Sequence, residues 1–287
     1  MTKALNTNPE TIKYSVLMSV YAKESPDFFE ESIKSMLSQT LFPDQIVLVK
    51  DGPLTEELDL VIDKFVEQYP TLFTIVPLNE NIGLGKALDE GLKYCRNELV
   101  ARMDTDDISL PNRCKEQVEM FINDPELSLV GTMIDEFYDE PENIVPSRIV
   151  PTEHEDIEKF IKRRSPFNHP TVMFKKKAVI DAGGYGKFRR KQDLDLFSRM
   201  VNKGFKTANI NKSLLLFRSN EDNFKRRKSW SYCKSYIDVQ YEIWKRGHCS
   251  FLDLSYVIVG QMIMYLAPMW LLKRISNKFL RDNSQYQ

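Results

Sequence analysis

Short apolar runs alternate with segments of helical spacing over the first hundred residues, and this alternation constrains the fold more than any other feature. The apolar runs cover residues 16–21, 46–49, 73–76 and 99–103. Between them, apolar residues recur at intervals of three and four, which is the spacing of one buried helix face. Strands that alternate with helices predict βαβ units, and therefore an α/β fold with a mainly parallel sheet flanked by helices.

Acidic residues follow two of these predicted strands. Asp51 follows the second strand, and Asp104, Asp106 and Asp107 follow the fourth. Ligands of parallel sheets bind beyond the carboxyl ends of the strands, so we expect these side chains at one binding edge. Three carboxylates within four residues repel one another, and Mn²⁺ or Mg²⁺ would collect them because hard cations take oxygen ligands. The plainer alternatives are an acidic turn before a helix near Asn112 and, at Asp51, an ordinary turn.

Length and charge set the remaining bounds. The 287 residues suit one large domain with an appendage, and 40 basic against 41 acidic residues give no reason to expect a nucleic-acid partner. From residue 225 onward, however, 11 basic residues face four acidic ones, a local net charge of roughly +7. The four cysteines form no CxxC pair and the first twelve residues are polar, which indicates reduced thiols in a cytosolic setting and no signal peptide.

The tail contains an uncharged stretch at residues 254–272. A helix of that length would span roughly 28 Å, close to the thickness of a bilayer core. Basic residues flank it on both sides, and all three tryptophans lie in this part of the chain. The favoured interpretation is attachment in the plane of an anionic membrane surface. Burial against the main domain or a dimer partner, and a true membrane span, remain open.

Several short motifs occur in a fixed order along the chain. They cover residues 15–21, 49–52, 79–87, 101–107, 111–113, 169–171, 183–185 and 192–196. Each motif alone is weak, but the ordered series resembles the family 2 glycosyltransferases, which have the GT-A fold. The resemblance runs from about residue 15 to 223 and is closest to bacterial members that add single sugars to capsule, exopolysaccharide or O-antigen units.

This resemblance implies a domain organisation and a donor site. A polar tail (1–12) precedes a GT-A domain (13–224) and a C-terminal helical, membrane-associating region (225–287). Asp104 and Asp106 would hold Mn²⁺ or Mg²⁺ against the donor diphosphate, and Asp107 would replace or assist one of them. The family pattern also places further residues at the nucleotide sugar: Asp51 at the uracil or ribose, Tyr21 and Lys23 near the nucleotide, and Lys86 and Arg102 at a phosphate or the nucleotide. For Lys86 and Arg102, solvated surface charge is the alternative.

The resemblance also supplies a candidate base. Similar enzymes use an acidic residue of a Glu-Asp pair at a helix start, and here the pair reads Gln192-Asp193. Asp193 is therefore the expected base, with Asp195 as its rival and a helix N-cap as the simpler role. His169 is a possible acceptor or phosphate contact, although a lone histidine is more often structural.

The expected activity is a metal-dependent, inverting transfer of one sugar from a nucleotide sugar, UDP being the favoured carrier. The acceptor would be a lipid-linked oligosaccharide at the cytoplasmic face of the inner membrane, and a homodimer is possible. The chain lacks the Gln-x-x-Arg-Trp motif of processive synthases. A sugar nucleotidyltransferase is disfavoured because segment 21–26 contains no glycine, and a dinucleotide oxidoreductase because the third fingerprint glycine is missing. A non-catalytic subunit that kept the fold stays open, since the Glu before Asp193 is absent.

Overall fold

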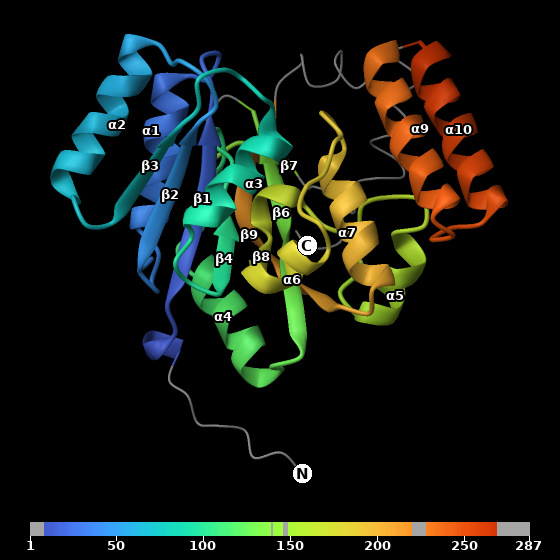
Figure 1. The fold of residues 1–287 in the computed structure, drawn as a ribbon, viewed down its shortest axis with the longest axis horizontal. Helices are drawn as coiled ribbons and strands as arrows, with labels where there is room; N and C mark the ends of the chain where they lie inside the picture. The colour runs from blue at the N-terminus through green and yellow to red at the C-terminus, as the bar shows by residue number, and fades with distance from the viewer. Residues whose placement is uncertain (1–8, 139, 146–148, 220–227, 269–287) are drawn as a thin grey trace.

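The computed structural model describes residues 9–138, 140–145, 149–219 and 228–268, and its centre is one extended β-sheet (Figure 1). A short 3-10 helix, η1 (Pro9–Thr11), precedes the first strand. The strand order is β3-β2-β1-β4-β8-β6-β9-β5, and β7 pairs with β6. Helices cover both faces of the sheet, and a helical hairpin stands at one side (Figure 1).

The N-terminal half matches the predicted βαβ pattern. Its strands are β1 (Tyr14–Val20), β2 (Gln45–Lys50), β3 (Phe73–Pro77) and β4 (Leu99–Arg102), and they pair with one another in parallel. The connecting helices are α1 (Pro26–Leu37), α2 (Glu56–Gln68) and α3 (Leu84–Tyr94). Successive strand residues alternate between the two faces of the sheet. One face packs against α3, and the other packs against α1 and α2.

The second half makes the complete sheet mixed rather than mainly parallel. The elements are β5 (Ile108–Ser109), α4 (Arg113–Asn123), β6 (Leu127–Phe137), β7 (Ile144–Val145), α5 (His154–Phe160), β8 (Met173–Lys175), α6 (Lys176–Asp181), α7 (Gln192–Asn202) and β9 (Lys206–Arg218). Strand β8 is antiparallel to both β4 and β6, and β5 is antiparallel to β9. A 3-10 turn, η2 (His169–Thr171), precedes β8, because Pro170 cannot donate to a sheet ladder.

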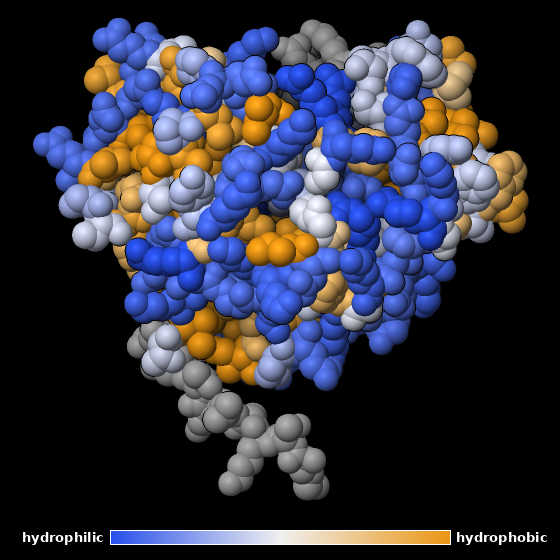
Figure 2. Space-filling view, viewed as in Figure 1, coloured by the Kyte–Doolittle hydropathy of each residue, from blue (hydrophilic) through white to orange (hydrophobic). Residues whose placement is uncertain are grey.

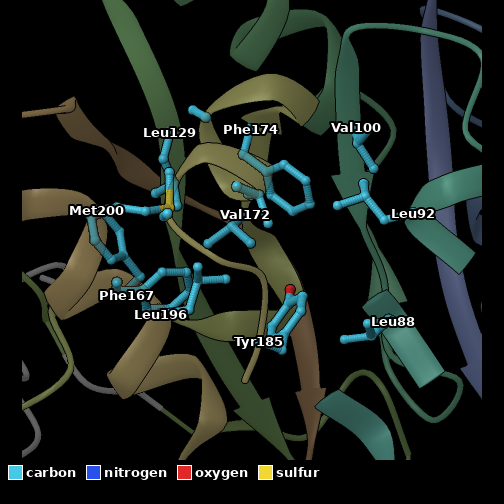
Figure 3. Packing of buried hydrophobic residues seen from close by; sticks show 14 of the residues in the cluster. Leu88, Leu92, Val100, Leu129, Phe167, Val172, Phe174, Tyr185, Leu196 and Met200 are labelled. Atoms are coloured by element: carbon cyan, nitrogen blue, oxygen red, sulfur yellow. The ribbon is translucent and has the colours of Figure 1, made fainter. Parts of the chain in front are cut away.

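A hydrophobic cluster between α3, the sheet and α7 lies beneath the binding edge. Figure 3 shows Leu88 of α3, Val172 and Tyr185 packed together in its interior. Gly91 lets α3 approach the sheet closely, because a Cβ atom there would come within 2.5 Å of Val49 and 2.6 Å of Leu17. This close contact fixes the position of α3, whose first turn borders the candidate site.

The described part of the C-terminal region is a helical hairpin of α9 (Trp230–Lys245) and α10 (Phe251–Leu266). The start of α9 and the end of α10 share one end of the hairpin, since the Trp230 and Tyr265 rings lie 5.4 Å apart. The uncharged stretch 254–272 is not one continuous helix, because α10 ends at Leu266 before Pro268; residues 269–272 lie outside the described residues. No helix within the described ranges combines the length and apolar character needed to cross a membrane.

Candidate active site

The three carboxylates after β4 converge at the carboxyl edge of the sheet. Ligand oxygens of Asp104, Asp106 and Asp107 all lie within 4.8 Å of one another. Asp107 is fully buried, and its Oδ1 accepts a hydrogen bond from the Arg218 backbone N–H at 2.9 Å. Its Oδ2 has no partner among the described residues. The group does not cap α4, because the N-cap of this helix is Asn112, which carries no side-chain cap bond.

Burial and repulsion between the carboxylates raise two pKa values in this acidic cluster. Burial, with the neighbouring Asp104 and Glu24 carboxylates, raises the pKa of Asp106 to about 7. Burial and the two other aspartates also raise the pKa of Asp107 well above its ordinary value. A buried carboxylate oxygen without a partner, beside two further carboxylates, fits the oxygen-ligand preference of Mn²⁺ or Mg²⁺. The residues present therefore suit the divalent cation that the sequence predicts.

Arg102 lies beneath this cluster and is only 1% exposed. Its Nη2 pairs with Oδ1 of Asp104, whereas Nε and Nη1 have no partner among the described residues. Arg113, also buried, donates to the Arg102 carbonyl oxygen at 3.0 Å and to that of Pro170 at 2.8 Å. The surface-charge alternative for Arg102 is therefore wrong. The geometry makes Arg102 a group that orients the Asp104 carboxylate, and its contact with a donor remains a prediction.

Asp51 connects the end of β2 to the loop that starts α3. Its Oδ1 accepts from the Ile82 N–H at 2.8 Å, and its Oδ2 accepts from the Gly83 N–H at 3.1 Å and the Asn81 amide at 3.0 Å. Gly52 is required beside it, because a Cβ there would lie 2.7 Å from the Asn81 nitrogen. Asp51 therefore does more than form an ordinary turn, because it fixes this loop at the edge of the sheet. Its contact with a uracil or ribose stays a prediction.

Three further residues that the sequence predicts to contact the nucleotide sugar are exposed at this edge. Tyr21 follows β1 and is 43% exposed, and Lys23 and Lys86 are exposed as well. The structure adds one residue that the sequence reasoning missed: Oε2 of Glu24 accepts from the Thr105 hydroxyl at 2.8 Å. Glu24 thereby brings a fourth carboxylate close to the acidic cluster.

His169 contacts a buried tyrosine of the glycine-rich loop at residues 183–186. Its Nε2 lies 3.0 Å from the hydroxyl of Tyr185, a completely buried residue of the 183–186 loop. Burial and the nearby Arg102 guanidinium lower the pKa of His169 well below its ordinary value, so the ring is neutral. Contact of His169 with an acceptor or phosphate remains a prediction. The surrounding glycines give no sequence signal that Tyr185 is buried.

The two carboxylates of α7 have different environments. Asp193 is partly exposed and makes no hydrogen bond or ion pair with the described residues. Asp195 is buried and paired with both Arg199, at 3.0 Å, and Arg246 of the hairpin. The N-cap of α7 is Lys191, which excludes the N-cap role considered for Asp193. Asp195 therefore joins α7 to the hairpin, whereas Asp193 has no such partner among the described residues and its role as the base stays a prediction.

The mixed sheet and the acidic cluster at its carboxyl edge are features of a GT-A glycosyltransferase. The profile of "Glycosyl transferase family 2" matches residues 15–195, and the chain belongs to this family. Both the family and the enzyme class expected from the motifs are thus confirmed.

Relatives and solved structures agree with this assignment. The chain is 39% identical to the amylovoran biosynthesis glycosyltransferase AmsE of Erwinia amylovora, over 79% of this chain and 84% of that protein. It is 33% identical to the UDP-Gal:alpha-D-GlcNAc-diphosphoundecaprenol beta-1,3-galactosyltransferase of Escherichia coli, over 94% and 99% of the two chains. S. aureus TarS 1-349 in complex with UDP-GlcNAc has a similar fold, with a TM-score of 0.65 at 15% identity over 93% of this chain and 76% of that one. These likenesses confirm the predicted GT-A fold.

Proposed function

We propose that the chain transfers one sugar, with inversion, from a UDP-sugar to a lipid-linked oligosaccharide during synthesis of a bacterial surface polysaccharide. The observation that carries the proposal is the pair of separated carboxylate groups: a crowded cluster at the sheet edge and the free Asp193 on α7. Support for the acceptor comes from the E. coli relative, whose name specifies a diphosphoundecaprenol-linked sugar. The AmsE relative supports a role in polysaccharide synthesis.

The protein's own groups divide the reaction between them. Mn²⁺ or Mg²⁺ held by Asp104 and Asp106, with Asp107 beside them, would neutralise charge on the leaving diphosphate. Arg102 keeps the Asp104 carboxylate in place through its ion pair. Asp193 takes the proton of the acceptor hydroxyl while that oxygen forms its bond to the anomeric carbon. The bond from this carbon to the phosphate oxygen breaks, and its electron pair leaves with the nucleoside diphosphate.

A calorimetric titration of UDP with and without Mn²⁺ tests the donor site, on the wild type and on Asp106→Asn. Binding that requires Mn²⁺ and disappears in the variant supports the proposal. Absence of binding by the wild type to UDP, GDP and dTDP would contradict it. Metal-dependent nucleotide binding without turnover of any donor and acceptor would instead favour a non-catalytic subunit, the alternative raised by Gln192.

We propose further that the hairpin attaches the enzyme to the cytoplasmic face of the inner membrane. Exposed apolar residues form one stripe along α10, and Figure 2 shows hydrophobic residues over this outer helix. The stripe consists of Leu252, Tyr256, Val259, Ile263 and Leu266. Its spacing of three and four residues places these side chains on one helix face, as interfacial helices require.

Vesicle binding separates membrane attachment from dimerisation. The Leu252→Ser, Leu266→Ser double variant removes two side chains that are 75% and 70% exposed, so the fold should tolerate it. We expect it to lose co-sedimentation with phosphatidylglycerol vesicles, whereas Leu60→Ser, at a residue of α2 that is 61% exposed, retains it. A wild type that stays in solution with vesicles but elutes as a dimer, which the double variant converts to monomer, would assign the stripe to a homodimer contact.

A further inference from the structure

The segment directly before α7 is strongly basic. Residues 187–191 read Lys-Phe-Arg-Arg-Lys, and no acidic residue occurs between Asp181 and Asp193. Lys187, Arg189 and Arg190 are exposed. Phe188 packs against the core cluster beneath, which fixes the segment to the body of the protein.

Arg189 contacts the loop at the candidate nucleotide-sugar site, and Arg190 contacts the hairpin. Arg189 Nη2 donates to the Asn81 side-chain oxygen at 3.1 Å, in the loop held by Asp51. Arg190 Nη1 donates to the Ser231 hydroxyl at 3.2 Å, in the first turn of α9. A guanidinium carries five N–H donors, so each arginine keeps donors available for a ligand. Bidentate binding of phosphate oxygens is the characteristic use of such groups.

Lys191 makes the segment rigid rather than contributing a free charge. Its ammonium lies 4.7 Å from the ring centroids of both Tyr232 and Tyr236 of α9. Its backbone is left-handed, with φ 59°, an uncommon conformation for a residue other than glycine. The contacts with α9 stabilise this conformation, so Arg189 and Arg190 are presented from a fixed backbone.

Three kinds of surface meet at this place. Asp193 is three residues from Arg190, so their α-carbons are at most about 11 Å apart. Arg190 contacts Ser231 at the end of the hairpin that also carries Trp230, 46% exposed, and Leu266, 70% exposed. The cations therefore lie near a carboxylate and near exposed apolar side chains. A lipid-diphosphate-linked sugar combines the three matching groups, which are a hydroxyl, a diphosphate and a lipid.

We propose that Arg189 and Arg190, with Lys187 beside them, form the subsite for the diphosphate of a lipid-carried acceptor. This inference deepens the proposed function and rests on it for the identity of the reaction. Because the cations lie so near Asp193, the glycan between the diphosphate and the attacked hydroxyl must be short. The enzyme would therefore act early in assembly, on the product of a reaction that transfers a first sugar phosphate from its activated carrier to a lipid phosphate.

Direct binding tests the subsite without requiring turnover. We would titrate farnesyl diphosphate, and farnesol as the uncharged probe, in EDTA, so that no metal in the donor site can bind the diphosphate. Arg190→Gln and Arg189→Gln should each weaken farnesyl diphosphate binding by about fivefold to tenfold, as expected for a partly exposed charge-assisted contact. Farnesol binding should not change. Lys115→Gln, at an exposed residue of α4, is the matched control and should leave both probes unaffected.

Each other outcome overturns the subsite. Unchanged farnesyl diphosphate binding in both arginine variants would exclude it, and so would an equal loss for farnesol, which would indicate a structural effect. An equal loss of inorganic diphosphate and UDP binding would assign the arginines to the donor. An equal loss of binding to phosphatidylglycerol vesicles would assign them to general lipid headgroups. Failure of the proposed function appears separately, as absent turnover in an enzyme that still binds farnesyl diphosphate.

Discussion

Replacing Asp106 with Asn should stabilise the metal-free protein and abolish its response to Mn²⁺. Burial, Asp104 and Glu24 raise the pKa of Asp106 from its ordinary value of 3.8 to about 7. A carboxyl whose pKa is higher in the folded state than in the unfolded state loses stability as the pH rises. The loss begins near the unfolded pKa, at about pH 4, and is complete above the folded value, at about pH 7.

The size of this effect follows from the shift. About three pKa units at 1.36 kcal/mol each correspond to roughly 4 kcal/mol at pH 8, and to about 1.5 kcal/mol at pH 5. Because Asp106 is partly exposed and its neighbours titrate with it, about half of each value is a realistic expectation. The Asn variant should therefore gain about 2 kcal/mol at pH 8, or about 4–8 °C in Tm, and under 1 kcal/mol at pH 5.

Thermal melts at pH 5 and pH 8, with EDTA or with Mn²⁺, measure this directly. The wild type should be stabilised by Mn²⁺ at pH 8 more than at pH 5, because binding requires ionised carboxylates. Asp63→Asn, at an exposed carboxylate of α2, is the matched loss of charge and should change neither behaviour. An Asp106→Asn variant that is destabilised at both pH values, or that keeps the full Mn²⁺ response, would refute the assignment of this carboxylate to a crowded metal site.

Three other substitutions test separate parts of the structure. Asp193→Asn should lower the turnover number by about 10²- to 10⁴-fold while calorimetry shows unchanged Mn²⁺-dependent UDP binding, because only the proton acceptor is lost; unchanged turnover would exclude the base assignment. Asp195→Asn should cost about 3 kcal/mol in urea unfolding, because it leaves Arg199 and Arg246 without their shared counter-charge; a change under 1 kcal/mol would contradict a structural ion pair. Gly91→Ala should cost about 1–3 kcal/mol, because the added Cβ would lie 2.5 Å from a side chain of β2; an unchanged Tm would show that α3 can shift.

Local patterns predicted the N-terminal half of the fold well. Strands β1, β2 and β4 are buried on both faces and read as continuous apolar runs, and each helix shows a single apolar stripe. The carboxyl ends of such strands necessarily share one edge, so Asp51 and Asp104 could be placed there from sequence. The prediction worked because short-range periodicity determines these elements.

The rest of the site could not be predicted from the sequence, because it depends on pairing between distant segments. Strand β9 shows little apolar alternation over its first half, yet it pairs with β6 and brings the Arg218 N–H to Asp107. Surface charge was an alternative for Arg102 from sequence, but β4 is an inner strand and buries it. Tyr185 was masked by surrounding glycines. In each case the deciding partner lies far away in sequence, where periodicity carries no information.

The hairpin is more than a detachable membrane tether. Val239 and Ile243 of α9 belong to the core cluster that also contains Leu194 and Leu196 of α7. Arg246 neutralises Asp195 two residues from the proposed base, and the α9 tyrosines hold Lys191 two residues before it. A truncation after residue 228 would therefore expose apolar core and leave charged groups on the helix that carries Asp193, so lost activity would say nothing about membranes. Substitutions confined to the exposed stripe of α10 remove the surface without disturbing α7, which makes them the discriminating test of attachment.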